Sequence, residues 1–386
     1  MPVLNSASLM QPEIAGWRRW LHERPELGFD LAQTQAFIAG KLEEFGCDAV
    51  VRDVGQAGIV ALIRGRMGDG PTIGLRADMD ALPIDEQSDL PHASRTQGRM
   101  HACGHDGHAA MLLGAARHLA ATRNFAGTVA LIFQPAEEIG QGAKAMLADG
   151  LMDRFDISRV YGMHNMPGIP TGQFAIRTGA IMGSVAKFTI TVQGRGGHAA
   201  HPHNAIDPIV AGAQLIEALQ TIVARETDPL ASLVVTLTRV IAGTTTNVIP
   251  DSIEIWGTVR ALEMADAQRA ERRIGEICKG VGQASGVEIT LDYDQAHPVT
   301  FNRTEDTAFV ARVAEEVGGS IDRNVRPVLA GEDFSHMLTA RPGAFIFIGN
   351  GDTPGLHHPA YDFDDDAIPA GVSYWVRLAE TALAAG

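Results

Sequence analysis

The chain of 386 residues is poor in cysteine and has no long apolar run. Its three cysteines are too few and too scattered for a disulfide framework, so we expect a reducing, cytoplasmic location. Apolar stretches such as Ala344 to Ile348 fall far short of the roughly 18 residues that a membrane helix requires. The N-terminal residues also lack the pattern of a secretion signal. The sequence therefore predicts a soluble protein with no membrane partner.

Cationic residues are also scarce, since 31 Lys and Arg stand against 46 Asp and Glu and give a formal net charge of −15. This sign is opposite to the one that a phosphate backbone attracts, so we expect no nucleic-acid partner. Hydrophobic residues make up 45% of the chain and charged residues 20%, which is typical of globular proteins and excludes disordered and collagen-like classes. The length suits two domains.

Short β-rich runs alternate with helical patterns in the first half of the chain. Thr72 to Arg76 is one such run, and His108 to Ala121 has helical character. This order predicts an α/β fold with a layered domain and a mostly parallel sheet. From residue 182 the pattern changes to the β-α-β-β-α-β order of a ferredoxin-like α+β fold. We therefore predict one domain from residues 1–181 and 297–386, and an inserted domain at 182–296.

Metal-binding side chains are concentrated in the segment Met100–His108, which holds three His, one Cys and one Asp. Thiolate, imidazole and carboxylate are the ligands that zinc and its first-row neighbours prefer. Cys103 and His105 can face one ion from a loop that leads into a helix. Two other interpretations remain open. Asp106 would cap a helix whose histidines are solvated, or Cys103 would act as a nucleophile paired with a histidine.

Two adjacent acids, Glu137 and Glu138, follow an apolar strand pattern that ends at Pro135. The carboxyl ends of strands are the places where open α/β sheets bind ligands. Adjacent carboxylates repel each other, so it is chemically sensible that a cation holds one while the other transfers protons. The alternative is an ordinary helix N-terminus, where acidic residues favour the positive end of the helix dipole.

Other candidate ligands also follow predicted strands or lie in loops. One of Asp78 and Asp80 can orient a ligating imidazole, although single aspartates at strand ends are usually turn formers. His164 follows an apolar strand, and His357 lies beside His358 in a loop bounded by proline. Alone, these would be core or surface histidines. One site with two ions uses all of these segments, which favours a dinuclear metal centre.

Seven motifs between residues 77 and 359 then indicate a family. They are Ala-Asp-Met-Asp-Ala-Leu-Pro, Met-His-Ala-Cys-Gly-His-Asp-Gly-His, Gln-Pro-Ala-Glu-Glu, Gly-Gly-His-Ala-Ala-His-Pro, Thr-Asn-Val-Ile-Pro-Asp, Ala-Gly-Glu-Asp-Phe and Leu-His-His-Pro. In this order they resemble the dinuclear-metal amidohydrolases that include hippurate hydrolase and indole-acetyl-amino-acid hydrolases, with aminoacylase and carboxypeptidase G as more distant relatives. The resemblance covers nearly the whole chain.

The resemblance implies two divalent metal ions per subunit, with zinc, manganese, cobalt or nickel as candidates. It implies that Cys103 bridges the two ions. His105 and His164 would complete one metal site, and Glu138 and His357 the other. His357 is favoured over its neighbour because the family pattern Leu-His-x-Pro places the ligand directly after leucine.

The resemblance also implies the reaction. Glu137 would act as the general base, and Asp80 would support the imidazole of His105 from behind. The expected activity is hydrolysis of the amide bond of N-acyl amino acids by metal-activated water, with hippurate-like substrates as the leading candidates. A metallo-dipeptidase or carboxypeptidase on the same scaffold is the alternative, and a protein that only binds metal or ligand is a further one.

The inserted domain is expected to be a lid and dimerisation domain by the same resemblance. His198 would reach the site of the neighbouring subunit and stabilise the developing oxyanion, which implies a homodimer or a dimer of dimers. Asn247 and Arg260 would hold the substrate carboxylate, for which the guanidinium fork is well suited.

Overall fold

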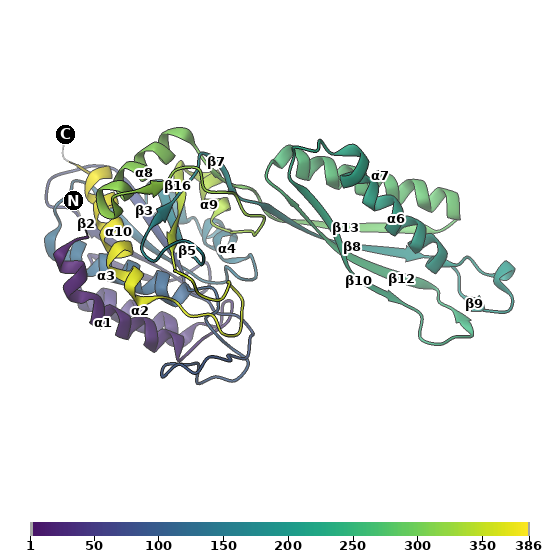
Figure 1. Ribbon diagram of the computed structural model, residues 1–386, viewed down its shortest axis with the longest axis horizontal. Helices are drawn as coiled ribbons and strands as arrows, with labels where there is room; N and C mark the ends of the chain where they lie inside the picture. Colours follow the sequence, from purple (N-terminus) through teal and green to yellow (C-terminus); the bar gives the residue numbers. More distant parts are fainter. Residues whose placement is uncertain (1–2, 385–386) are drawn as a thin grey trace. The chain divides into compact units, whose positions relative to one another are not determined.

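The computed structural model describes residues 3–384, so residues 1–2 and 385–386 of the first predicted domain lie outside the described residues. The chain divides into two compact units (Figure 1). Unit 1 comprises the chain up to Ile181, Phe301–Arg326 and the chain from Asp333 onward, and unit 2 comprises Met182–Thr300 and Pro327–Glu332. Unit 2 extends beyond residue 296 because its last long strand continues to His297.

Within the described residues, an eight-stranded sheet forms the centre of unit 1, in the order β1-β2-β4-β3-β5-β16-β6-β15. Its four central strands, β4, β3, β5 and β16, run parallel to one another. These strands are buried along nearly their whole length, as expected of parallel strands whose two faces are both covered. The strands are β1 (Ala49–Val54), β2 (Gly58–Arg64), β3 (Thr72–Asp78), β4 (Thr128–Gln134), β5 (Ile157–Met166), β6 (Phe174–Ala175), β15 (Ile321–Asp322) and β16 (Gly343–Gly349).

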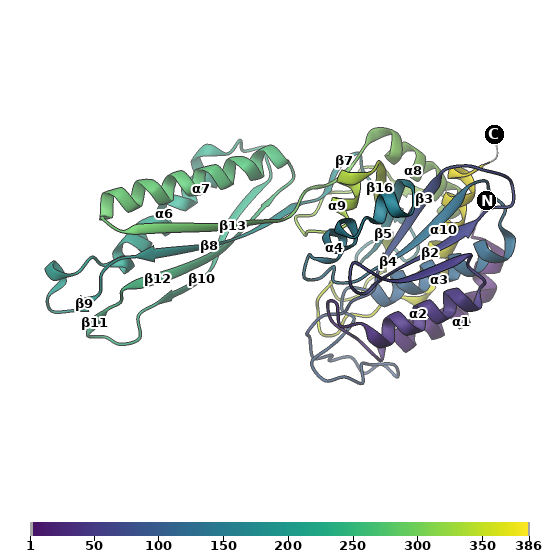
Figure 2. The ribbon, with the colours of Figure 1, turned by 180° about the vertical axis from the view of Figure 1, so that it is seen from behind.

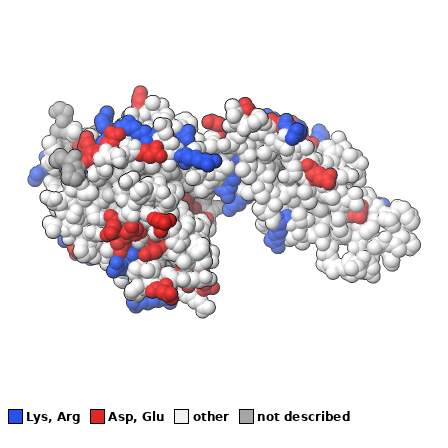
Figure 3. All heavy atoms as spheres, in the orientation of Figure 1, with Lys and Arg blue, Asp and Glu red and all other residues white. Residues whose placement is uncertain are grey.

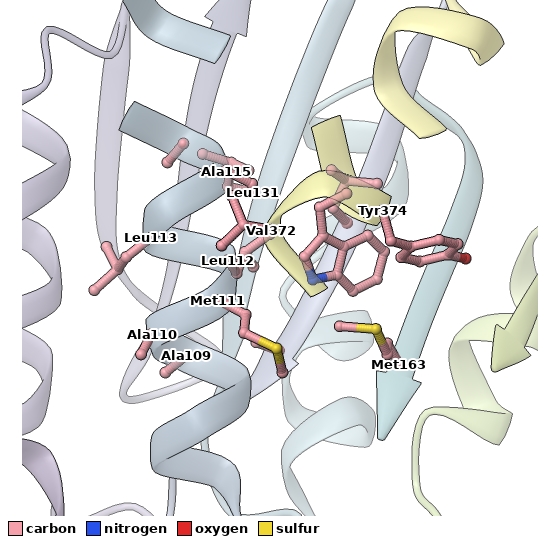
Figure 4. Packing of buried hydrophobic residues seen from close by; sticks show 14 of the residues in the cluster. Ala109, Ala110, Met111, Leu112, Leu113, Ala115, Leu131, Met163, Val372 and Tyr374 are labelled. Carbon is pink, nitrogen blue, oxygen red and sulfur yellow. The ribbon is translucent and has the colours of Figure 1, made fainter. Parts of the chain in front are cut away.

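Helix α3 (His105–Thr122) is the central helix of unit 1 and is buried on nearly all sides. It contacts β3, β4 and β5 as well as three other helices, α1, α2 and α10. Leu112 on α3 belongs to the same buried cluster as Leu131 on β4 and Val372 on α10 (Figure 4). This packing fixes the N-terminus of α3, where the candidate ligand His105 lies. The other helices are α1 (Asn5–His22), α2 (Ala32–Glu44), α4 (Gly142–Ala148), α5 (Leu151–Arg154), α8 (Thr304–Gly318), α9 (Ser335–Ala340) and α10 (Ile368–Ala382).

Unit 2 has a four-stranded antiparallel sheet in the order β10-β12-β8-β13. Apolar residues alternate along β8 and β12, and helices α6 and α7 pack on the face that these residues form (Figure 2). The order of elements and strands is that of a ferredoxin-like fold, so the predicted fold class is confirmed for both units. The elements are β8 (Ser184–Gln193), β9 (Gly197–His198), α6 (Pro208–Glu226), β10 (Leu233–Ala242), β11 (Val248–Ile249), β12 (Ser252–Ala261), α7 (Met264–Ser285) and β13 (Glu288–His297).

The surface reflects the negative charge of the sequence. Acidic side chains gather on the face of unit 1 that Figure 3 shows. Among residues 3–384, no helix is both long enough and apolar enough to span a bilayer.

A core substitution tests the packing of α3. Leu112 is 0% exposed and Leu9 is 83% exposed. Leu112→Ala should lower the free energy of unfolding by about 2–5 kcal/mol, because it removes buried methyl groups and leaves a cavity. Leu9→Ala, the same change at the surface, should alter it by less than about 0.5 kcal/mol. Urea denaturation of both variants measures the difference, and equal losses would contradict the observed burial.

Candidate metal centre

The loop before α3 turns tightly at Gly104, which has φ +86°. A Cβ atom at this position would lie 2.3 Å from Asn165 Nδ2 and 2.5 Å from Tyr361 Oη. Only glycine combines this backbone conformation with so close an approach. The turn brings the Cys103 side chain and the His105 ring, on either side of it, to the same small volume.

The parallel sheet brings the other candidate residues to the same place. Glu137 and Glu138 follow β4, Asp80 follows β3, and His164 lies near the end of β5. Because β4, β3 and β5 are parallel neighbours, their carboxyl ends meet at one edge of the sheet. Segments distant in sequence therefore converge beside the N-terminus of α3.

Two groups of potential ligands share Cys103. The ligand atoms of Cys103, His105 and His164 all lie within 4.8 Å of one another, and so do those of Cys103, Glu138 and His357. The Cys103 Sγ atom is 3.4 Å from His164 Nε2, and Glu138 Oε2 is 3.4 Å from His357 Nε2. The structure thus brings together all five residues that the sequence nominates as ligands, in the two predicted groups.

The buried imidazoles of His105 and His164 both direct Nε2 toward the shared ligand groups. His105 Nδ1 lies 2.9 Å from the main-chain oxygen of Asp80, and His164 Nδ1 lies 2.6 Å from that of Asn165. A carbonyl oxygen can only accept a hydrogen bond, so each Nδ1 carries the proton and donates. In a neutral ring the lone pair is then on Nε2, which is the arrangement that metal-ligating histidines require.

Buried polar atoms without partners show that these residues fit a metal. Among the described residues, His105 Nε2 and Glu138 Oε1 are buried without a hydrogen-bond partner, and they lie 3.9 Å apart. Burial and the nearby charge of Glu138 raise the pKa of the Cys103 thiol well above its ordinary value. Burial also raises the pKa of Glu138 to about 7. Divalent cations would pair with these atoms and stabilise the thiolate, so the donor set fits two divalent ions.

Asp80 holds the turn that carries the two glutamates. Its carboxylate accepts hydrogen bonds from the main-chain N–H groups of Glu137 at 2.9 Å and Glu138 at 3.2 Å. Its carboxylate oxygen is 3.6 Å from His105 Nδ1, whereas its main-chain oxygen is closer at 2.9 Å. Asp80 therefore supports His105 mainly through its backbone. Glu137 is 9% exposed, and its Oε1 accepts a hydrogen bond from the Asp333 main-chain N–H at 3.3 Å.

The alternative in which Asp106 caps a helix beside solvated histidines is wrong. Helix α3 has no side-chain cap, and His101, His105 and His108 are all buried. The Asp106 carboxylate is also buried, and it accepts a hydrogen bond from His22 Nδ1 at 2.8 Å. The raised pKa of the Cys103 thiol also argues against the nucleophile interpretation, which requires a readily formed thiolate.

The two adjacent histidines near the C-terminus differ in their contacts. His357 has φ +65°, and its main-chain N–H donates to Ala102 O at 2.7 Å, which holds the loop beside Cys103. Burial and the charge of His105 lower the pKa of His357. His358 instead accepts a hydrogen bond at Nδ1 from the main-chain N–H of Ala360, at 3.0 Å.

Three predicted residues lie in unit 2, and the chain does not bring all of them together. His198 on β9 pairs with Val248 on β11, and Ala199 N–H donates to Asn247 O at 3.1 Å, so His198 and Asn247 are close (Figure 2). Arg260 is the penultimate residue of β12, which begins just after the β11 segment. At about 3.3 Å per residue, the strand spans roughly 26 Å from its start to Arg260. Asn247 and Arg260 of one chain are therefore separated.

Behind the candidate ligands, Asp78 belongs to a buried network whose other members received no role from the sequence. Arg76 donates to Asp78 at 2.6 Å and to Asp333 at 3.2 Å, and all three are buried. His108 and Asn165 form a second part of this network. The available signals were an arginine inside an apolar strand pattern, the aspartate of the Ala-Gly-Glu-Asp-Phe motif, and the third histidine of the Met100–His108 segment.

Comparison with known proteins shows which family these features define. The family described as Peptidase family M20/M25/M40 matches residues 74–381. Hippurate hydrolase of Campylobacter jejuni is 43% identical over 372 residues, covering 96% of each chain, and N-acetylcysteine deacetylase of Bacillus subtilis is 40% identical over 367 residues, covering 94% of each. A crystal structure of a Bacillus subtilis protein, described as a dinuclear metal binding peptidase from the M20 family, matches with a TM-score of 0.85 and 36% identity, covering 97% of this chain and 99% of that one.

This chain belongs to peptidase family M20/M25/M40. The resemblance predicted from the motifs is confirmed, and with it the prediction that the protein is a metal-dependent hydrolase. The ligand groups around Cys103 agree with two divalent ions in such an enzyme.

The buried pair of His22 and Asp106 predicts a dependence of stability on pH. Burial lowers the pKa of His22, but the Asp106 carboxylate and a hydrogen bond with Glu86 outweigh this effect and raise it from 6.5 to about 9. A raised pKa in the folded state gives stability that is complete below pH 6.5 and is lost as the pH rises through about 9. The loss amounts to about 3 kcal/mol, at about 1.4 kcal/mol per pKa unit.

Melting temperatures of the metal-free protein between pH 6 and 10 measure this effect. The wild-type protein should lose stability steeply over that range, and His22→Gln should flatten the dependence. His203→Gln, at an exposed histidine, serves as the control and should keep the wild-type slope. Identical slopes for wild type and His22→Gln would refute the assigned charge on His22.

Proposed function

We propose that this protein is a dinuclear metal-dependent amidohydrolase that cleaves N-acyl amino acids, hippurate-like compounds foremost, into a carboxylic acid and a free amino acid. The observation that carries the proposal is the pair of ligand groups that share Cys103, beside the buried carboxylate of Glu137. The activities named for the related hippurate hydrolase and N-acetylcysteine deacetylase support it.

Glu137 is proposed as the general base. When bound, two divalent ions would polarise the scissile carbonyl and lower the pKa of water. Cys103, His105, Glu138, His164 and His357 would hold them, and their chemistry suits zinc, manganese, cobalt or nickel. Glu137 takes the proton of the attacking water and delivers it to the departing amine, which is otherwise too basic to leave. The Asp333 N–H orients the Glu137 carboxylate for this transfer.

Substitution of Glu137 tests this role. Glu137→Gln keeps the shape of the side chain but removes the base, so turnover of N-benzoylglycine should fall by at least about 100-fold. The metal content, measured by elemental analysis, should remain near that of the wild-type protein because Glu137 is not proposed as a ligand. Glu138→Gln is the matched comparison and should lower the metal content as well. Wild-type turnover by Glu137→Gln would exclude Glu137 as the base.

Arg260 is proposed to bind the carboxylate of the substrate. Within the part of the chain that the structure describes, its half-buried guanidinium has no hydrogen-bond or ion-pair partner, and burial lowers its pKa. It lines a cavity of about 340 Å³ on the sheet face opposite α6 and α7, together with Lys187 and Trp256. A partly desolvated guanidinium without an acidic partner favours a carboxylate ligand, which it can bind through two parallel hydrogen bonds.

A homodimer, or a dimer of dimers, is proposed to complete the site. His198 and Asn247 lie far along β12 from Arg260, so a second copy of unit 2 is a natural source of one set of these groups. Unit 2 also exposes apolar side chains on its edge strand β10 and on α6, a pattern typical of an interface. Unit 2 (predicted as 182–296) would thus serve as the lid and dimerisation domain. These exposed side chains are Val240 and Ile241 on β10, and Ile209, Val210 and Val223 on α6.

A mixing experiment tests whether His198 serves the partner's site. Glu137→Gln and His198→Ala are each expected to be inactive alone. Co-expressed in equal amounts, they should regain about a quarter of wild-type activity, because about half of the dimers are mixed and each mixed dimer has one site with both intact residues. If His198 acts within its own subunit, every site carries one defect and no activity returns. Co-expression of Glu137→Gln with Glu138→Gln, both in unit 1, is the control and should stay inactive.

The alternative function is a metallo-dipeptidase or carboxypeptidase. It is favoured by the description of the related Bacillus subtilis structure as a peptidase. The two functions differ in whether the substrate has a free amino group, so hydrolysis of N-benzoylglycine and of a glycine dipeptide by the same metal-loaded preparation separates them.

A cytoplasmic location is part of the proposal, since a reducing compartment would keep the Cys103 thiol available.

A further inference from the structure

The imidazole of His108 connects two segments behind the candidate metal centre. His108 lies one helical turn after His105 on α3 and is 2% exposed. Its Nδ1 is 2.6 Å from Asp78 Oδ1, and its Nε2 is 2.8 Å from the main-chain nitrogen of Asn165 and 3.0 Å from Asn165 Nδ2. It is not one of the five proposed ligands.

These contacts determine which ring nitrogen carries the proton. The main-chain N–H of Asn165 can only donate, so His108 Nε2 must offer its lone pair. The proton is then on Nδ1, where it donates to the Asp78 carboxylate. Strand β3 pairs with β5 only as far as Gly162. The Asn165 N–H therefore does not bond to β3 and can donate to the His108 ring.

Asn165 in turn contacts both segments that carry buried candidate ligands. Its Nδ2 donates to the main-chain oxygen of Cys103 at 2.6 Å, and its own main-chain oxygen accepts from His164 Nδ1 at 2.6 Å. Its Oδ1 accepts from the Tyr361 hydroxyl at 2.7 Å. Both Nδ2 and Oδ1 of the Asn165 amide are therefore hydrogen-bonded, which fixes the orientation of the amide. The fixed amide in turn holds the backbone at Cys103.

The other end of the network is the buried ion pair of Arg76 and Asp78. Asp78 Oδ2 accepts from Arg76 Nη1 at 2.6 Å, and Arg76 Nη2 donates to Asp333, whose N–H holds Glu137. The chain of contacts thus runs from a permanent ion pair, through one imidazole, to the ligand-bearing backbone.

We propose that His108 is a positioning residue of the metal centre: as the Nδ1–H tautomer it connects Asp78 to Asn165, and Asn165 sets the His164 ring and the Cys103 backbone. The proposal rests on the proposed function, because it takes Cys103 and His164 to be metal ligands. It assigns a role to the third histidine of the Met100–His108 segment that is distinct from metal ligation.

Two substitutions of His108 separate its two contacts. The amide of Asn reaches the position of Nδ1 and can still donate to Asp78, but it leaves the Asn165 N–H without an acceptor. The amide of Gln reaches the position of Nε2 and can still accept from Asn165, while the contact with Asp78 is lost. If His108 acts through Asn165, His108→Gln keeps the function and His108→Asn loses it. If its only role is to donate a hydrogen bond to Asp78, the order is reversed.

Cobalt binding by the metal-free protein is the measurement, followed through the thiolate-to-cobalt absorption in the near ultraviolet. His108→Asn should weaken Co²⁺ binding by about 10- to 100-fold and reduce the intensity of the thiolate band. For His108→Gln, the fold-loss in Co²⁺ binding should be no more than a tenth of the fold-loss for His108→Asn. Equal binding by His108→Asn and wild type, or weaker binding by His108→Gln than by His108→Asn, would overturn the proposal.

A milder substitution covers the case in which both variants fail to fold. Tyr361→Phe removes only the hydroxyl that donates to Asn165 and should weaken Co²⁺ binding several-fold with a smaller thiolate band. Tyr374→Phe is the matched control, since Tyr374 is buried and its hydroxyl has no hydrogen-bond partner among the described residues. Equal cobalt binding by these two variants would also overturn the proposal.

The same preparation distinguishes failure of this inference from failure of the proposed function. Wild-type protein that binds Co²⁺ with a thiolate band but does not hydrolyse N-benzoylglycine or a dipeptide would contradict the function, while the order of the His108 variants would still support the positioning role. Wild-type protein that hydrolyses N-benzoylglycine, together with unchanged Co²⁺ binding by His108→Asn, would refute the positioning role alone.

Discussion

The candidate centre depends on one physical constraint. Side chains that bind cations through negative charge or a lone pair are buried together, where water cannot solvate them. A thiol, two imidazole Nε2 atoms and a carboxylate face one another within 4.8 Å in overlapping groups. Without a cation, burial keeps the Cys103 thiol protonated and leaves His105 Nε2 without a partner. Two divalent ions resolve both problems at once, so the cost of this burial is itself an argument for metal.

The local motifs of the sequence were enough to nominate the ligands and the α/β and ferredoxin-like classes. Cys103 and His105 are two residues apart, and the candidates Glu138 and His164 lie at the ends of strands, where parallel neighbours bring their ends together. Such signals depend on chemistry and on the order of elements, which a sequence displays. The contact of the His105 ring with the Asp80 backbone could not be predicted, because any residue type supplies a main-chain oxygen.

Other features depend on geometry that no local pattern contains. The role of Asn165 follows from β3 pairing with β5 no further than Gly162. The separation of Asn247 from Arg260 follows from the length of β12, whereas the sequence places them only as neighbours along the chain. A buried network such as Arg76 with Asp333 joins residues more than 250 positions apart, and only the folded chain shows that they meet.

The two ligand groups differ in their access to solvent. Cys103, His105 and His164 are all buried, whereas in the second group the His357 side chain is 53% exposed and the Glu138 side chain 8%. An ion held by the second group would be open to solvent at His357, whereas an ion held by the first would be enclosed by buried side chains. The pair of cations would therefore be kinetically unequal: a chelator would remove them one after the other, and the half-loaded protein would be a distinct, long-lived species.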